Sequence, residues 1–245
     1  MNYKRLKRHL IQLDTVDSTN NYAANLLKTS IVANGTTVMT KRQTAGKGQR
    51  GNSWTTEDGK NLILSIILFP DLQTKETINL TLAISLAVYK TISHYLAAVS
   101  IKWPNDILAS EKKIAGILIE NQLRGDRISS SIVGIGINVN QENFEAGINA
   151  TSFKKELNQD FNLQDLFSEL FINLDFYMNL LMEKNFKILL SRYYERMYRI
   201  NVPSDFEDSS GRFRGTIKGI DEAGKLIVTR EGISTYYDLK EIKFI

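Results

Sequence analysis

Glycine alternates with cationic and amide side chains in the segment KRQTAGKGQRGNSW, residues 41–54. Glycine lets backbone N–H groups turn toward a ligand, and cations placed among such groups favour an anion. We therefore expect Lys47 and Arg50 to face a phosphate or a carboxylate. The spacing is not that of a Walker loop and no helix pattern follows directly. A flexible surface loop with solvated charges is the alternative.

A second polar group, KWPND, occupies residues 102–106 and follows a short apolar pattern typical of a strand. Pro104 ends the strand and fixes a turn, so Asn105 and Asp106 are presented at the strand's end. Their oxygen atoms are the kind that Mg²⁺ prefers, and a neighbouring Trp can stack on a base. Ordinary turn chemistry accounts for the same residues without a ligand.

Lys113 lies at the start of the strand pattern KKIAGILIE, residues 112–120. With a period of two it shares a face with Ala115, Ile117 and Ile119, where an unpaired ammonium group would be unfavourable. We expect an anionic partner or ligand for Lys113. The alternative is a lysine at a strand end that reaches solvent.

The strand pattern GIGIN places Gly134, Gly136 and Asn138 on one face. The two glycines indicate either tight packing or room for a flat ligand. The third glycine and the helix start of a dinucleotide-binding fingerprint are missing, which excludes a Rossmann fold.

The elements that must position these residues are typical of an α+β domain followed by a small β domain. Period-two and buried apolar patterns predict strands at residues 9–13, 36–40, 62–69, 100–103, 113–120 and 131–139. Helical periodicity predicts helices at 18–27, capped by Asp17 or Ser18, at 78–96, and twice within 163–199, with a break at 183–185. Short alternating strands after Pro203 predict a β-barrel. We expect domains at 1–199 and 200–245, the second lying apart from the polar motifs.

The composition excludes several kinds of site. The 245 residues include no Cys and only two His, so disulfides, thiolate nucleophiles, iron–sulfur clusters and a His-based metal site are excluded or disfavoured. The net charge is +4, and residues 1–60 hold ten Lys/Arg but four Asp/Glu. This positive region is either a solubilising face or a site for an anionic ligand, such as a nucleotide phosphate, or for an acidic partner. Neither a membrane helix nor a secretory signal is predicted, and we expect a cytoplasmic protein.

Taken in order, DSTN (17–20), QTAGKGQRGNSW (43–54), KWPND (102–106), KKIAGILIE (112–120), GIGINVN (134–140) and ATS (150–152) resemble the biotin protein ligases. The ordered set spans most of that family's catalytic domain, and the C-terminal β segment is similar to the family's SH3-like domain. The resemblance implies an α+β fold, in which a mixed β-sheet packs with helices as in class II synthetases, plus a small C-terminal SH3-like β-barrel.

The same resemblance implies a two-step reaction. The carboxylate of biotin attacks the α-phosphate of ATP, giving biotinyl-5′-AMP and pyrophosphate, and a lysine of a biotin carboxyl carrier domain then displaces AMP. Biotin and ATP are substrates, and Mg²⁺ is expected to enter with ATP rather than to occupy a dedicated protein site. The oligomeric state, including a homodimer, stays open.

By resemblance, roles fall on three groups of residues. The implied catalytic residues are Lys113, Lys47 and Asp106, with Asp106 a candidate to help the acceptor lysine lose its proton. Biotin binding is implied for Ser18, Thr19, Asn20, Gln43, Gly46, Lys113 and Gly116. Nucleotide or phosphate binding is implied for Lys47, Gly48, Gln49, Arg50, Trp54, Asn105 and Asn138.

Two departures from the family pattern have consequences. The glycine loop commonly has GRGR in the family but GKGQ here, so Lys47 replaces an arginine and the neutral Gln49 replaces a second cation. The motif DSTN begins at residue 17, which leaves no space for the DNA-binding helix-turn-helix of bifunctional members. We therefore expect a ligase that does not bind DNA.

Two other functions compete with this assignment. A lipoate ligase shares the fold and the adenylate chemistry, but its Arg-Arg, Gly-Gly-Gly and His-Asp signatures are not present. A nucleic-acid-binding module is suggested by the basic N-terminal region and the small C-terminal barrel. The C-terminal segment is not especially basic and lacks the aromatic spacing of an RNA-binding sheet.

Overall fold

The computed structural model describes residues 9–245, apart from the side chain of Arg50. Its larger sheet has seven strands in the order β1-β2-β3-β7-β6-β5-β4. β1 and β2 are parallel, whereas the other neighbouring strands are antiparallel. The strands are β1 (Leu10–Val16), β2 (Thr36–Gln43), β3 (Leu62–Leu68), β4 (Val99–Lys102), β5 (Asp106–Ala109), β6 (Lys112–Arg124) and β7 (Arg127–Ile137). The predicted mixed sheet is therefore confirmed.

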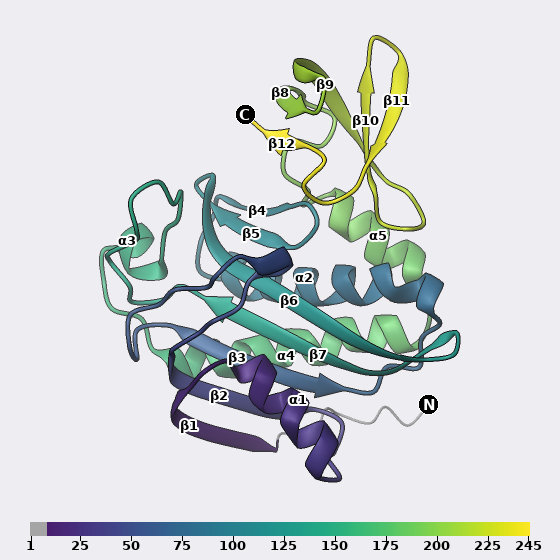
Figure 1. Cartoon of the computed structure of the whole chain (residues 1–245). Coiled ribbons are helices and arrows are strands. Elements are labelled where there is room, and N and C mark those ends of the chain that lie inside the picture. Colours follow the sequence, from purple (N-terminus) through teal and green to yellow (C-terminus); the bar gives the residue numbers. More distant parts are fainter. Residues whose placement is uncertain (1–8) are drawn as a thin grey trace.

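Helices cover both faces of this sheet (Figure 1). α1 (Thr19–Thr29) packs on one face, and α2 (Thr77–Ser93) and α4 (Leu163–Met182) cover the other. α5 (Phe186–Tyr194) packs against the helices α2 and α4. α4 ends at Met182 and α5 begins at Phe186, which confirms the predicted break at 183–185. The short elements α3 (Phe153–Leu157), η1 (Gln49–Gly51) and η2 (Thr74–Glu76), like β5, are not predicted from the sequence. Within residues 9–245, no helix is long and apolar enough to cross a membrane.

β3 is buried on both faces because it lies in the middle of the larger sheet, between β2 and β7. Its even-numbered apolar residues belong to the main hydrophobic core with α2 and α4: Leu62, Leu64, Ile66 and Leu68. On the opposite face Ile67 packs with Ala23 of α1. The run LILSIILF is thus a buried strand, as predicted, except for its last residue, Phe69, which follows the strand and is exposed. The odd-numbered residues of β3 face α1 and the cavity described below.

β6 departs from simple alternation at Ile114. Its pairing with β5 shifts by one residue there, so Ile114 is an extra residue that forms a β-bulge. The expectation that Lys113 shares a face with Ala115 and Ile117 is therefore wrong. Lys113 instead lies beside Gly116, since its Nζ is 3.3 Å from the position that a Cβ at Gly116 would take.

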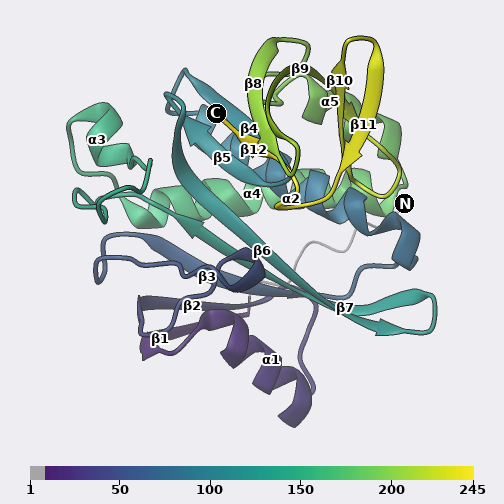
Figure 2. The ribbon, with the colours of Figure 1, turned by 45° about the horizontal axis from the view of Figure 1, so that its top comes forward.

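The C-terminal strands form a second, antiparallel sheet in the order β11-β10-β9-β8-β12. These strands are β8 (Pro203–Asp208), β9 (Gly211–Ile220), β10 (Leu226–Arg230), β11 (Ile233–Tyr237) and β12 (Lys243–Phe244). The end strands β11 and β12 do not pair with each other in the described structure, so the expected closed barrel is not formed. The small sheet lies over β4, β5 and α5 (Figure 2).

Candidate active site

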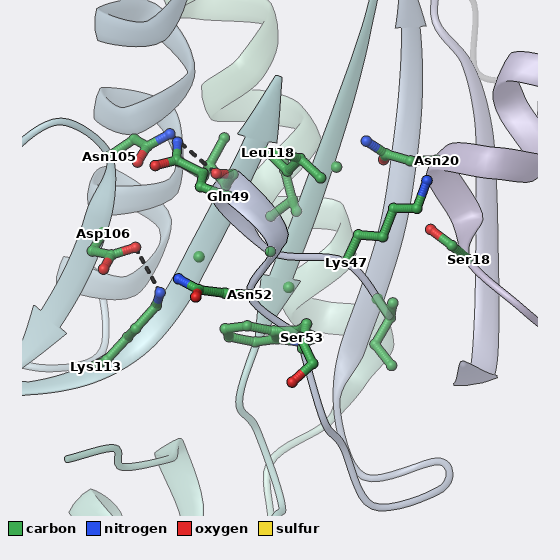
Figure 3. A pocket seen from close by; sticks show the side chains of 18 of the residues that line it. Ser18, Asn20, Lys47, Gln49, Asn52, Ser53, Asn105, Asp106, Lys113 and Leu118 are labelled. Atoms are coloured by element: carbon green, nitrogen blue, oxygen red, sulfur yellow. Dashed lines mark hydrogen bonds and ion pairs between the residues drawn. The ribbon is translucent and has the colours of Figure 1, made fainter. Parts of the chain in front are cut away.

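A cavity of about 220 Å³ opens on the α1 side of the larger sheet. Its floor includes Ile63, Gly116 and Gly136, which are neighbours across β3, β7 and β6 in register. Most of the predicted site residues line this one cavity: Ser18, Thr19, Asn20, Gln43, Lys47, Gly48, Gln49, Trp54, Asn105, Asp106, Lys113 and Gly116. Figure 3 shows Ser18 and Asn20 on one side of it and Asp106 and Lys113 on the other.

Lys113 has the anionic partner that the sequence predicts. Its Nζ lies 2.7 Å from Oδ1 of Asp106, which is the first residue of β5 (Figure 3). The same ammonium group lies 5.5 Å from the centre of the Trp54 ring. The cation of Lys113 is therefore held at the cavity wall by a carboxylate and an aromatic ring.

The two glycines of β7 make room for side chains of this chain. A Cβ at Gly136 would lie 2.5 Å from Cε2 of Trp54, and a Cβ at Gly134 would lie 2.4 Å from Oδ1 of Asn20. Both distances are below 3.0 Å, so any other residue at these positions would force the Trp54 or Asn20 side chain to shift. Of the two alternatives for GIGIN, the structure shows tight packing, by Trp54 on one glycine and Asn20 on the other.

A buried polar cluster surrounds the start of α1. Oε1 of Gln43 accepts from the backbone N–H of Thr19 at 2.8 Å and from its hydroxyl at 3.1 Å. Ser65 Oγ lies 2.7 Å from Thr19 Oγ1 and 2.5 Å from Asn20 Oδ1. Ser18 precedes α1 but its side chain makes no capping bond. Ser18, Thr19 and Asn20 are at most 3% exposed, so this neutral polar surface is built into the cavity wall.

The glycine loop is closed by its own backbone. The N–H of Gly48 donates to the carbonyl of Asn52 at 2.7 Å, and the N–H of Trp54 donates to the carbonyl of Gly46 at 2.9 Å. These two amides therefore do not face the cavity as an anion cradle in this state. Gly46 itself does not line the cavity. A Cβ there would lie 2.3 Å from the carbonyl oxygen of Trp54, so glycine is required for the loop to close.

Lys47 points from this loop toward α1 (Figure 3). Its Nζ donates to Oδ1 of Asn21 at 2.5 Å, and Nδ2 of Asn21 donates to Asp17 at 2.5 Å. The hydrogen bond from Asn21, with a further one from the backbone of Ser18, lowers the pKa of Asp17. Lys47 is thus tied to α1 through a chain that ends on a carboxylate.

The turn between β4 and β5 presents oxygen atoms next to Lys113. Nδ2 of Asn105 donates to the carbonyl of Ile117 at 3.0 Å, while its Oδ1 is buried with no hydrogen-bond partner among the described residues. Lys102 lies behind the turn, where burial lowers its pKa and the charge of Asp106 acts in the opposite direction. Its Nζ is 4.9 Å from the centre of the Phe244 ring.

The C-terminal sheet contributes to the cavity, contrary to the expectation that this domain lies apart. Leu239 and Lys240 line it, and Nε1 of Trp103 donates to the carbonyl of Gly224 at 2.9 Å. A second cavity of about 330 Å³ lies between the two sheets and shares Gln49, Trp103, Pro104, Asn105 and Leu239 with the first. Sequence analysis missed Leu239 and Lys240 because no motif marks them.

One predicted nucleotide-binding residue, Asn138, is placed differently. Asn138 does not line the cavity, and its Nδ2 donates to the carbonyl of Thr151 at 3.0 Å, which fixes the chain after β7. The side chain of Arg50 lies outside the described residues.

This chain is similar to several known proteins. The biotin/lipoate A/B protein ligase family matches residues 13–138. The bifunctional ligase/repressor BirA of Bacillus spizizenii is 33% identical over 236 residues, 94% of this chain and 72% of the relative. The biotin–[acetyl-CoA-carboxylase] ligase of Paracoccus denitrificans is 34% identical over 131 residues, 52% of this chain and 53% of the relative.

Among solved structures, the biotin protein ligase from Aquifex aeolicus in complex with biotin and ATP has a TM-score of 0.79 and 28% identity, covering 97% of this chain and 98% of that one. The family match includes the cavity residues from α1 to β7. The fold, the sequence similarity and the cavity lining all indicate the same family. The chain therefore belongs to the biotin/lipoate A/B protein ligase family.

Proposed function

We propose that this chain is a biotin protein ligase, which forms biotinyl-5′-AMP from biotin and MgATP and then transfers the biotinyl group to a lysine of a biotin carboxyl carrier domain. The observation that carries the proposal is a single cavity with neutral, buried hydrogen-bonding side chains on one side and a lysine–aspartate pair on the other (Figure 3). The names of the Paracoccus and Aquifex relatives support it.

The polar cluster at the start of α1 favours biotin over lipoate. A ureido group has two N–H donors and a carbonyl acceptor, and Ser18, Thr19 and Asn20 supply hydroxyl and amide groups that are almost fully buried. The dithiolane ring of lipoate has neither N–H donors nor a carbonyl acceptor. Thr19 and Asn20 are held by hydrogen bonds to Gln43, Ser65 and Glu120, so the cluster is a fixed polar wall that suits a ureido group better than an apolar ring.

In the first step, a carboxylate oxygen of biotin bonds to the α-phosphorus of ATP while the bond to the bridging oxygen breaks and pyrophosphate leaves. An anion here approaches a polyanion, so positive charge must offset the repulsion. Lys47, Lys113 and Lys240 line the cavity, and Lys113 and Lys47 are the two cations that the family motifs supply. For Lys113 to serve, the substrate anion takes the place of Asp106 as its partner.

A magnesium ion that arrives with the phosphates fits the residues of the β4–β5 turn. Asp106 offers a carboxylate and Asn105 an amide oxygen that is buried without a partner, both typical Mg²⁺ ligands. Within residues 9–245, no group of three or more His, Cys, Asp or Glu is arranged so that it could hold a metal ion. When bound, the ion would neutralise phosphate charge.

In the second step, the amine of the acceptor lysine bonds to the acyl carbon, the bond from that carbon to the phosphate oxygen breaks, and AMP leaves. The attacking amine must first lose a proton, because an unperturbed lysine has a pKa of about 10.4. Asp106 is the carboxylate of the cavity wall that can take this proton once Lys113 contacts the phosphate.

Pyrophosphate exchange tests the proposal. Purified protein is incubated with MgATP, labelled pyrophosphate and either biotin or lipoate, and in a second reaction with labelled biotin and a carrier domain. We expect exchange that requires biotin, and label on the carrier. Equal exchange with lipoate would instead assign a lipoate-type ligase. Salt-sensitive binding of DNA or RNA without any biotin-dependent exchange would assign a nucleic-acid-binding module.

A further inference from the structure

Tyr193, the penultimate residue of α5, is fully buried and its hydroxyl points at the active-site turn. The hydroxyl donates to the carbonyl of Pro104 at 2.9 Å. Pro104 lines both cavities. Burial raises the pKa of Tyr193 far above its usual range, with smaller contributions from Tyr194 and Asp106, so the phenol stays a hydrogen-bond donor throughout the pH range of an assay.

The turn that carries Asn105 and Asp106 is fixed by contacts on three successive residues. Trp103 Nε1 donates to the carbonyl of Gly224, and Asn105 Nδ2 donates to the carbonyl of Ile117. Pro104, between them, has no N–H, so its carbonyl is its sole backbone hydrogen-bonding group. Tyr193 satisfies that carbonyl and thereby fixes the middle of the turn, directly before Asn105 and before Asp106, which pairs with Lys113.

The next residue, Tyr194, provides a contrast. Its hydroxyl donates to the carbonyl of Ile220 at 3.1 Å and accepts from the N–H of Ile220 at 3.0 Å, so it bonds to the C-terminal sheet. A Cβ at Gly219 would lie 2.6 Å from this hydroxyl. Two adjacent tyrosines of one helix therefore hold different parts of the structure, one the active-site turn and the other β9.

We propose that Tyr193 is a positioning residue for adenylate formation, acting through the Pro104 carbonyl to hold Asn105 and Asp106 in place. This inference rests on the proposed function. It predicts that loss of the hydroxyl affects the nucleotide half of the site and leaves biotin binding intact, because the biotin half is held by separate hydrogen bonds among Thr19, Gln43 and Ser65.

The experiment compares Tyr193→Phe with Tyr194→Phe, since each removes one hydroxyl from neighbouring positions of α5. Biotin-dependent adenylation is measured in single turnovers, below the melting temperature of both variants, with biotin and MgATP varied in turn. For Tyr193→Phe we expect at least a roughly tenfold loss in the adenylation rate or a comparable rise in KM for MgATP, with KM for biotin within about twofold of the wild type. Tyr194→Phe should lower Tm while all three kinetic values stay within about twofold.

A double-mutant cycle separates positioning from general destabilisation. If Tyr193 acts through the turn, Tyr193→Phe should have a smaller relative effect in the Asp106→Asn background than in the wild type. Equal kinetics for the two tyrosine variants, a parallel loss for biotin and MgATP, or fully additive effects in the cycle would overturn the inference. A wild-type protein without biotin-dependent exchange would instead refute the proposed function, and normal exchange by Tyr193→Phe would refute only the role of Tyr193.

Discussion

Nζ of Lys113 and Oδ1 of Asp106 lie 2.7 Å apart, and the side chains are 34% and 35% exposed, respectively, inside the same cavity. An ion pair with this much exposure contributes only about 0–1 kcal/mol to stability. It is therefore weak enough to open when a more highly charged anion enters. Under the proposed mechanism, the pair would place a cation for the first step and a carboxylate for the second at adjacent positions.

Replacing Lys113 should separate catalysis from folding. We expect Lys113→Ala to slow adenylate formation by at least ~10²-fold, the scale for loss of one electrostatic stabiliser of a transition state, with little change in Tm. The matched control is Lys112→Ala, since Lys112 is the exposed neighbour on the same strand. Single-turnover adenylation and thermal unfolding check both variants. A normal rate for Lys113→Ala would make Lys113 merely structural.

The two glycines of β7 should divide the site into its halves. Gly136→Ala should displace the Trp54 ring and raise KM for MgATP, whereas Gly134→Ala should displace Asn20 and raise KM for biotin, each by about tenfold or more. The chain has only two tryptophans, so a change in tryptophan fluorescence is expected for Gly136→Ala and not for Gly134→Ala. The same KM changes for both variants would contradict the division.

Patterns of hydrophobicity predicted the elements of the sheet well, because burial is a strong local signal. Residues 62–68 form a buried inner strand, and residues 183–185 separate α4 from α5 as predicted. β5 was missed because a four-residue strand directly after Pro104 and Asn105 has too few residues for a period to show. The motif residues from α1 to β6 were brought to one cavity by the fold that their resemblance implied.

The geometry around Lys113 could not be predicted in the same way. A bulge at Ile114 depends on how β6 pairs with β5, and this pairing leaves no mark in the sequence of either strand. The contribution of Leu239 and Lys240 depends on how the second sheet docks, which the hydrogen bond from Trp103 to Gly224 helps to fix. Long-range contacts of this kind decide the last details of the site.

The two tryptophans should differ in their contribution to stability. Nε1 of Trp103 is bonded to Gly224, whereas Nε1 of Trp54 is buried without a partner among the described residues. Trp103→Phe should therefore lose about 0.5–1.5 kcal/mol from that hydrogen bond in addition to the loss from smaller packing, which corresponds to a fall of at least a few degrees in Tm. Trp54→Phe loses no hydrogen bond and should fall less. Thermal unfolding of both checks this, and an equal fall would show that the bond to Gly224 contributes nothing.

The last prediction concerns Gln49, where the family commonly has arginine. Gln49 begins η1 and lines both cavities. Asn105 also lines both cavities, and its Oδ1 has no hydrogen-bond partner among the described residues. An arginine forms charge-assisted hydrogen bonds worth about 1.5–3 kcal/mol, against about 0.5–1.5 kcal/mol for a glutamine. If the adenylate is held less tightly here for this reason, Gln49→Arg should slow its dissociation and reduce labelling of bystander lysines.

The alternative is that the neighbouring Arg50 has taken over retention of the adenylate. In that case Gln49→Arg should change little, and Arg50→Ala should release biotinyl-5′-AMP faster. The rate at which labelled adenylate dissociates from the wild type and from both variants distinguishes the two mechanisms. Slower release from Gln49→Arg supports the first mechanism, and faster release from Arg50→Ala supports the second. Identical rates in all three proteins would contradict both mechanisms and would show that neither position 49 nor Arg50 determines retention of the adenylate.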